Sequence, residues 1–475
     1  MFSGNNQLPQ QHVFCNYSIK TMNKEIINKY NIQAPRYTSY PPANYFKEIN
    51  EPDFIKTIQD SNDAKRNNVS FYLHFPYCKR LCHYCGCNSF KWNNQESTDK
   101  YVDALHKEID LVAKHLDKNR RISQIHYGGG SPSQLSASTL KELNQHLLSL
   151  MPTIDNPEIA IECHPGFLNR EGWEAIADSG FNRVSIGIQD TDTNVLEAVN
   201  RQPSILPIKE IFEILKSKGI IINLDFLYGL PYQTPQKYEH AIAQAVSLRP
   251  DRIVTFSYGH VPWVFKRQQV LEKLGLPDSQ TKEEMATRAA DTILKAGYRR
   301  IGMDHFVLPD DELSQALDTH QLHRNFQGYC TLRTTGQVYA FGATGISQLD
   351  DAFAQNAKNI DEYIATVNSG HLPVAHGYKL NAKEKVMREI SESLMCNYYL
   401  DFDVLAKEFN MSVDEIKACI NYDEDKLNEM TADGLINMSG NIIAMAEMGS
   451  PFVRNVVAAL DPLMINTDKK FSKPI

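Results

Sequence analysis

The chain has 475 residues, of which 42% are hydrophobic and 22% charged, which is ordinary for a globular protein of two or three domains. Its 49 basic and 57 acidic residues give a net charge of −8, which argues against nucleic acid or an anionic membrane as the main partner. The polar N-terminus lacks a signal-peptide pattern, and no apolar run reaches the roughly 18 residues of a membrane span. The sequence therefore predicts a cytoplasmic protein without a membrane span.

The first 50 residues predict an irregular arm. Residues 35–45 read PRYTSYPPANY and are rich in proline and tyrosine. Such a segment should run extended over the surface of another part of the protein.

From residue 69 onward, short runs of β-branched and aromatic residues alternate with amphipathic stretches. This alternation predicts β-α-β units on a parallel sheet, either an open sheet or a partial barrel. In both folds ligands bind at the carboxyl ends of the strands, where polar residues and glycines recur here. The strands are expected at 69–75, 122–127, 159–162, 184–188, 220–227 and 253–258, and the helices at 101–116, 140–150, 171–179, 208–218, 236–247 and 281–296.

Beyond about residue 375 the pattern becomes mainly helical. Helices are expected at 382–394, 402–409, 412–420 and 427–435, followed by a possible hairpin at 436–446. This order is typical of a small winged-helix module, but residues 401–433 hold ten acidic side chains and three lysines, the reverse of what phosphate binding needs. The sequence therefore predicts an arm at 1–50, a barrel at 51–375 and a packing or lid domain at 376–475.

Four of the nine cysteines fall within ten residues, in the spacing Cys78-x3-Cys82-x2-Cys85-x-Cys87. Thiolates suit zinc or iron–sulfur clusters, and without an export signal a disulfide scaffold is not expected. Structural zinc normally takes two well-separated ligand pairs, and no second pair exists here. A cubane cluster can be held by a single loop. If three cysteines hold a [4Fe–4S] cluster, one iron remains open to a small molecule.

The motif CxxxCxxC after the first strand resembles that of the radical S-adenosylmethionine (SAM) superfamily. With the fourth cysteine, the chain is similar over nearly its whole length to oxygen-independent coproporphyrinogen III oxidases. The segments that carry this resemblance are PRYTSYP at 35–41, HYGGGSP at 126–132, NLDFLYGLP at 223–231, IGMDHFVLPDDEL at 301–313 and HRNFQGY at 323–329.

The resemblance implies a partial (β/α)6 barrel with an N-terminal arm and a mainly helical C-terminal domain. It implies oxidation of coproporphyrinogen III to protoporphyrinogen IX in heme synthesis, by a 5′-deoxyadenosyl radical derived from SAM. Cys78, Cys82 and Cys85 would hold one [4Fe–4S] cluster per chain, whose open iron binds the first of two SAM molecules. The other partner is an unidentified electron donor, and a monomer is expected.

The resemblance also assigns roles to further residues. Ser131 stands where the family commonly has threonine, and Cys163-His164 departs from the family pattern of an aliphatic residue and an aspartate. Asp225 interrupts an apolar strand, where a carboxylate needs partners or a purpose. The implied SAM contacts are Tyr72, Gly129, Gly130, Ser131, Glu162, Gln189, Arg201 and Asp225, with Gly259 and Ile346 at the second SAM, and Tyr84 would bind at the cluster and shield it. Tyr72 and Cys87 are the implied catalytic residues, and Arg36, His305 and Arg324 the candidates for binding substrate propionates.

Two alternatives share the superfamily. A heme chaperone would bind rather than oxidise its ligand, but such relatives usually carry an aromatic residue in place of Cys87 and lack the PRYTSYP arm. Another radical SAM enzyme acting on tetrapyrroles, such as a heme-opening methyltransferase, is the second alternative. A structural zinc protein is more distant.

Overall fold

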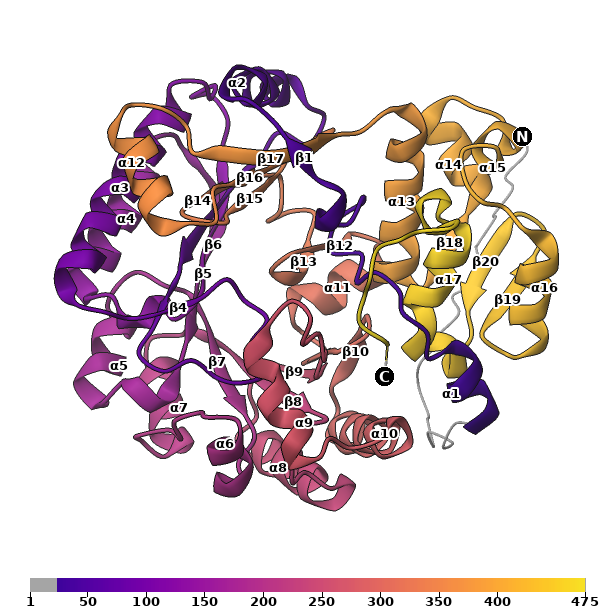
Figure 1. Ribbon diagram of the computed structural model, residues 1–475, viewed down its shortest axis with the longest axis horizontal. Coiled ribbons are helices and arrows are strands. Elements are labelled where there is room, and N and C mark those ends of the chain that lie inside the picture. The colour runs from indigo at the N-terminus through magenta and orange to yellow at the C-terminus, as the bar shows by residue number, and fades with distance from the viewer. Residues whose placement is uncertain (1–23, 475) are drawn as a thin grey trace, which may run out of the picture.

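A 13-stranded sheet forms the centre of the molecule in the computed structural model, which describes residues 24–474 (Figure 1). Six neighbouring strands run parallel in chain order. They are β2 (Val69–Phe75), β5 (Ile122–Gly129), β6 (Thr153–Cys163), β7 (Arg183–Gln189), β8 (Ile221–Tyr228) and β9 (Arg252–Ser257). The six predicted strands of a partial barrel are thus confirmed. β14 (Gln337–Phe341) lies parallel to β2 on its other side and extends this block.

The predicted helices follow these strands and cover the outside of the sheet (Figure 1). They are α3 (Gln95–Ala113), α4 (Ala137–Ser149), α5 (Arg170–Ala177), α7 (Ile208–Lys216), α8 (Pro235–Ser247) and α10 (Ser279–Lys295). α3 begins earlier than predicted because the Asn94 side chain accepts a hydrogen bond from Ser97 N at 2.9 Å and caps the helix there. The largest fully buried side chain, Trp173 of α5, packs in the core between helices and sheet.

Short antiparallel strands flank the parallel block, and the sequence did not predict them. One edge carries β15 (Ile346–Gln348), β16 (Ala352–Asn356), β17 (Val374–Lys379) and β1 (Lys47–Glu48), and the other carries β11 (His305–Val307) and β10 (Arg299–Ile301). β1, β10, β11 and β15 have two or three residues each and give almost no period-2 pattern to recognise, whereas β16 and β17 have five and six residues. The prediction of an irregular arm is wrong in part, because it holds α1 (Lys24–Tyr30), the 3-10 turn η1 (Ala43–Tyr45) and β1.

The C-terminal part has its own hydrophobic core, separate from the core of the barrel. The sequence predicted four of its helices and a hairpin: α13 (Ala382–Asn397), α14 (Phe402–Phe409), α15 (Val413–Lys417), α16 (Glu424–Ala432), and the hairpin of β19 (Ile436–Ser439) and β20 (Ile442–Met445). It did not predict β18 (Tyr399–Asp401) or α17 (Val453–Leu460). The domain boundaries at residues 50 and 375 stay a prediction. No helix between residues 24 and 474 combines the length and apolarity that crossing a membrane requires.

The remaining elements are short and connect the others. They are α2 (Glu51–Asp60), β3 (Tyr77–Cys78), β4 (Phe90–Lys91), α6 (Thr193–Ala198), α9 (Gln269–Leu274), α11 (Glu312–Asp318), the hairpin of β12 (Leu322–Asn325) and β13 (Gly328–Thr331), α12 (Ile360–Asn368), and the 3-10 turns η2 (Ser61–Asp63), η3 (Pro132–Gln134), η4 (Pro165–Phe167), η5 (Lys266–Gln268), η6 (Glu447–Phe452) and η7 (Pro462–Met464).

Candidate functional site

The cysteine loop leaves the sheet after β2, and neighbouring elements hold it in place. Its two ends are the short parallel strands β3 and β4. His83 N donates to Val199 O at 2.9 Å, just after α6. Gln268 Nε2 donates to Tyr84 O at 3.0 Å from η5. A loop fixed at both ends and along its length presents its thiols in a defined arrangement before any ligand binds.

Two arginines bring positive charge to the thiols. Arg201 donates to Cys82 Sγ at 3.6 Å and to the Tyr84 hydroxyl at 3.0 Å. Arg267 Nε donates to the backbone oxygen of Cys85 at 3.2 Å. Cationic neighbours favour the thiolate, which is the form that binds metal.

The cysteines differ in their acidity. A hydrogen bond from the Cys87 side chain, together with its backbone N–H 3.4 Å from Cys85 Sγ, lowers the pKa of Cys85 to about 6. Burial raises the pKa of Cys78 to about 12. A thiol loses its proton when it binds a metal ion. The positive charge of an iron would therefore stabilise the Cys78 thiolate, which burial alone disfavours.

The donor set fits a cluster of several irons. Among residues 24–474, no group of three or more His, Cys, Asp or Glu side chains converges on one metal ion. Cys78, Cys82 and Cys85 nevertheless lie on one loop that neighbouring elements hold in place. In a cubane each thiolate binds a different iron, so the three sulfur atoms need not point at a single position. The loop therefore suits the predicted cluster better than a single ion.

The glycine run at the end of β5 lies against β2 and β6. A Cβ atom at Gly128 would lie 2.8 Å from Glu162 Oε1, and one at Gly129 would lie 2.7 Å from the His74 ring. Gly129 also has φ +109°, which favours glycine. Two backbone N–H groups of this segment are already bonded within the protein, because Gly130 N donates to Phe75 O at 2.7 Å and Ser131 N to Tyr77 O at 3.0 Å. These bonds attach the glycine run to the start of the cysteine loop.

Tyr72, His126 and Glu162 lie side by side on β2, β5 and β6. The rings of Tyr72 and His126 stack with centroids 5.9 Å apart, and His126 Nε2 lies 3.1 Å from Glu162 Oε1. The Tyr72 hydroxyl lies 3.2 Å from His74 Nδ1. The Glu162 side chain remains 41% exposed, so its oriented carboxylate can accept hydrogen bonds from a ligand.

On the next two strands, Asp225 is held by two hydrogen bonds. Ser185 Oγ donates to its Oδ2 at 2.5 Å and Asn223 Nδ2 donates to its Oδ1 at 2.8 Å. Burial nevertheless raises the pKa of Asp225. A ligand that donates further hydrogen bonds to this carboxylate would stabilise its ionised form.

Arg201 joins the end of β7 to the cysteine loop. Its Nη2 donates to the backbone oxygen of Gly187, and a Cβ at Gly187 would lie 2.8 Å from Gln189 Nε2 and 2.9 Å from Arg201 Nη2. The structure therefore brings Gln189, Arg201, Tyr84 and Cys82 together.

Gly259 and Ile346 lie on different parts of the sheet. Gly259 follows β9, where a Cβ would lie 3.0 Å from Arg36 Nη2. Ile346 begins β15 and packs against the C-terminal core. Six strands separate β15 from β9 in the sheet, so one ligand could touch both only across the mouth of the barrel.

The three candidate substrate residues meet near Asp304. His305 Nδ1 lies 2.7 Å from Asp304 Oδ1, and Arg324 donates to the backbone oxygen of Arg36. Desolvation lowers the pKa of Arg36, Asp304 counteracts this, and the charge of Arg324 lowers it further. Arg324 is 9% exposed, and its Nε is buried without a hydrogen-bond partner among the described residues. The charges of Arg36 and Arg324 thus both act on the single carboxylate of Asp304. The Nε–H of Arg324 remains available to donate a hydrogen bond to a further anion.

Sequence reasoning missed several members of this site. Arg267 in η5 and Lys282 in α10 lie in no sequence pattern that separates them from ordinary surface cations. Lys282 Nζ donates to Tyr258 O at 3.3 Å. The spacing of Asn223 and Asp225 on one strand, with both side chains on the same face, was the signal that could have revealed Asn223.

Comparisons with known proteins identify the family of the chain. Residues 72–245 match the model of the Radical SAM superfamily. The oxygen-independent coproporphyrinogen III oxidase of Synechocystis sp. is 33% identical over 455 residues, covering 95% of this chain and 97% of that protein. That of Pseudomonas aeruginosa is 34% identical over 456 residues, covering 95% and 98%. The solved coproporphyrinogen III oxidase of Escherichia coli, described as a radical SAM enzyme, superposes with a TM-score of 0.85 at 31% identity and covers 93% of this chain and 100% of that one. The chain therefore belongs to the oxygen-independent coproporphyrinogen III oxidase family of the radical SAM superfamily.

Proposed function

We propose that the protein catalyses the oxygen-independent oxidative decarboxylation of coproporphyrinogen III to protoporphyrinogen IX, converting two propionates to vinyl groups. The observation that carries the proposal is that Arg36 lies against the end of β9, next to the strand ends that hold Glu162 and Asp225. Relatives at 33–34% identity over 95% of the chain bear the name of this activity, which supports it.

Cys78, Cys82 and Cys85 would hold the [4Fe–4S] cluster. When bound, the cluster and SAM supply the radical chemistry that removes hydrogen from an unactivated carbon. The protein's own residues bind the cluster, SAM and the substrate and orient them relative to one another. Arg201 neutralises charge at Cys82 and holds Tyr84, and Glu162 and Asp225 offer carboxylates to SAM. The proposed catalytic residues, Tyr72 and Cys87, would act beside the reacting carbon.

A second SAM molecule is part of the proposal, at Gly259 and Ile346. Its support is the missing side chain at Gly259, which lets the Arg36 guanidinium lie against the backbone there, since a Cβ would lie 3.0 Å from Arg36 Nη2. An SAM at this position would share the barrel mouth with the substrate. Counting methionine produced per vinyl group formed tests whether each decarboxylation uses one SAM.

The substrate carries four propionates, and three cations, Arg36, Arg324 and Lys282, lie near one another at the mouth of the barrel. Arg36 and Arg324 lie near the single carboxylate of Asp304, which their charges help to keep ionised. Desolvation, and next the nearby charge of Arg36, lower the pKa of Lys282 to about 8. Guanidinium groups bind carboxylates through paired hydrogen bonds, so a propionate would relieve this repulsion.

The affinity for substrate should fall as the pH rises above about 8. Lys282 faces the Tyr258 carbonyl and the charges of Arg36 and Arg454, and it loses its own charge through that range. Because only protonated Lys282 attracts a propionate, KM for coproporphyrinogen should rise with pH, up to about tenfold per unit. Lys282→Arg, which stays charged, should abolish the rise, and Lys282→Met should show a high KM throughout. An unchanged pH profile of KM in Lys282→Met would contradict a role for this lysine.

The alternatives give different results with defined ligands. A heme chaperone would bind heme tightly and leave coproporphyrinogen unchanged, and a heme-opening methyltransferase would consume heme in the presence of SAM. We expect anaerobic turnover of coproporphyrinogen III and none of heme. Turnover of heme alone would overturn the proposed substrate.

A further inference from the structure

We propose that Arg454 and Asp461, both in the C-terminal domain, are positioning residues that hold the N-terminal arm so that Arg36 reaches the mouth of the barrel. This inference rests on the proposed function, because it assigns to the C-terminal domain a part in binding the carboxylates of the substrate. In this proposal, Arg454 and Asp461 act through the arm and do not contact the substrate.

Asp461 fixes the arm through two tyrosines. It is fully buried at the start of η7, and its Oδ2 accepts from the Tyr37 hydroxyl at 3.0 Å. Its Oδ1 accepts from the Tyr40 hydroxyl at 2.9 Å and from Leu463 N at 2.9 Å. Hydrogen bonds to a buried carboxylate are costly to leave unmade, so the two tyrosines fix the position of the arm between them.

Arg454 holds the arm on the other side of Arg36. It is 4% exposed in α17, and among residues 24–474 no carboxylate accepts from it, whereas several backbone oxygens do. Its Nε donates to Pro35 O at 2.9 Å and its Nη2 donates to Ala34 O. Nη2 also donates to the Ser472 hydroxyl at 3.2 Å, and a buried arginine whose other donors go to carbonyl groups fixes the course of the backbone.

The same guanidinium also holds the C-terminal tail. Nη2 of Arg454 donates to Ser472 O at 2.8 Å, and Nη1 donates to Lys473 O at 3.1 Å. Ala34 N donates to Ser472 O at 3.3 Å, so arm and tail pair directly. The tail thus returns from the C-terminal domain toward the barrel (Figure 1).

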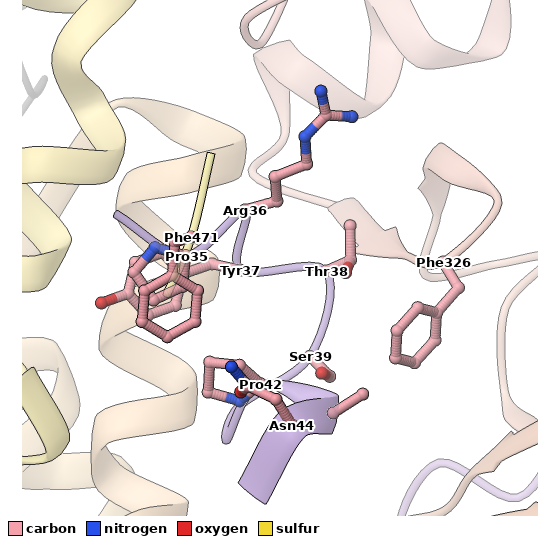
Figure 2. Close-up of a pocket in the computed structure, with 10 residues that line it drawn as sticks. Pro35, Arg36, Tyr37, Thr38, Ser39, Pro42, Asn44, Phe326 and Phe471 are labelled. Carbon is pink, nitrogen blue, oxygen red and sulfur yellow. The ribbon is translucent and has the colours of Figure 1, made fainter. Parts of the chain in front are cut away.

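Arg36 extends from this fixed segment toward the barrel. Its side chain points away from Pro42 and Asn44 (Figure 2), its Nη2 donates to Ser257 O at 3.3 Å, and it lies beside Gly259. The arm, Phe326 and Phe471 enclose a pocket of about 160 Å³ next to it. Residues 34 and 35 are held by Arg454 and residues 37 and 40 by Asp461, so Arg36 sits in the middle of a segment anchored on both sides.

A double-mutant cycle tests this positioning. Arg454→Met keeps the length of the side chain and removes its donors. We expect KM for coproporphyrinogen III to rise about tenfold in Arg454→Met and in Arg36→Ala, and the double variant to be no worse than Arg36→Ala. Iron content and dithionite-driven SAM cleavage should stay at the wild-type level in Arg454→Met. Arg454→Lys should recover part of the loss.

Arg120 supplies the matched control. It is 3% exposed and donates to Asn67 O at 2.7 Å and to the Tyr339 hydroxyl, away from the arm. Arg120→Met should destabilise the fold without raising KM. If Arg454→Met does not fold, the double variant Tyr37→Phe/Tyr40→Phe takes its place in the cycle. Additive effects of Arg454→Met and Arg36→Ala on KM would overturn the inference.

A readout without substrate separates this inference from the proposed function. Amide hydrogen exchange of residues 34–41 should speed up at least tenfold in Arg454→Met, and not in Arg120→Met. Unchanged exchange in a folded Arg454→Met protein would refute the positioning role, whatever the substrate is. A wild-type protein that fails to turn over coproporphyrinogen, with faster exchange in Arg454→Met, would refute only the proposed function.

Discussion

Replacement of Cys82 by serine should abolish cluster assembly and SAM cleavage, whereas Cys87→Ser should keep most of the iron and lose most vinyl formation. Cys82 is 7% exposed and lies beside Arg201, inside the loop. Cys87 is exposed, and its N–H bonds Cys85 Sγ. A fourth thiolate on the cluster would occupy the iron that SAM needs, so Cys87 should lie near the cluster without binding it.

Iron content and absorbance of the two variants, purified without oxygen, measure this difference. The wild type should be brown, contain about four irons and labile sulfide per chain, and bleach in air. Cys87→Ser should match it, and Cys82→Ser should be colourless. Equal loss of iron in both variants would make Cys87 a ligand. Stoichiometric zinc without sulfide in the wild type would overturn the cluster altogether.

Asp225→Ala should weaken SAM binding by about tenfold or more while the fold stays intact. The substitution leaves Ser185 and Asn223 without their acceptor and removes the carboxylate offered to the ligand. The loss of a charge-assisted hydrogen bond costs about 1.5–3 kcal/mol. Equilibrium dialysis with labelled SAM measures the affinity in the reconstituted variant.

Asp225→Asn is the control for local structure. The amide keeps an acceptor for one neighbour and restores the shape of the side chain, so its thermal stability should match the wild type. If SAM binding also weakens in Asp225→Asn, the negative charge is what SAM uses. Unchanged SAM affinity in a well-folded Asp225→Ala protein would leave Asp225 with a structural role only.

The sequence predicted the barrel because its central strands are long enough to show a pattern. β2 coincides with the expected residues 69–75, since its apolar residues continue on both faces. The strands at the two edges were not predicted, because β10, β11 and β15 have three residues each. Their pairing depends on neighbours that are distant along the chain, and local periodicity does not contain that information.

The residues of the candidate site that belong to recognisable sequence motifs could be predicted. Cys78, Cys82 and Cys85 follow from their spacing, Asp225 from a carboxylate in an apolar strand, and Glu162 only from the family resemblance. Arg454 and Asp461 could not be found in this way, because each acts through residues more than 400 positions away. Nor could the sequence show that the N–H groups of Gly130 and Ser131 bond the cysteine loop, since such bonds depend on which strands become neighbours.

The most direct test of the account is anaerobic incubation of the reconstituted protein with coproporphyrinogen III, SAM and a reductant, followed by chromatography of the oxidised porphyrins. The account predicts protoporphyrin with two vinyl groups, an intermediate with one, and methionine formed in step with the vinyl groups. Full iron content and SAM cleavage without any vinyl product would contradict it.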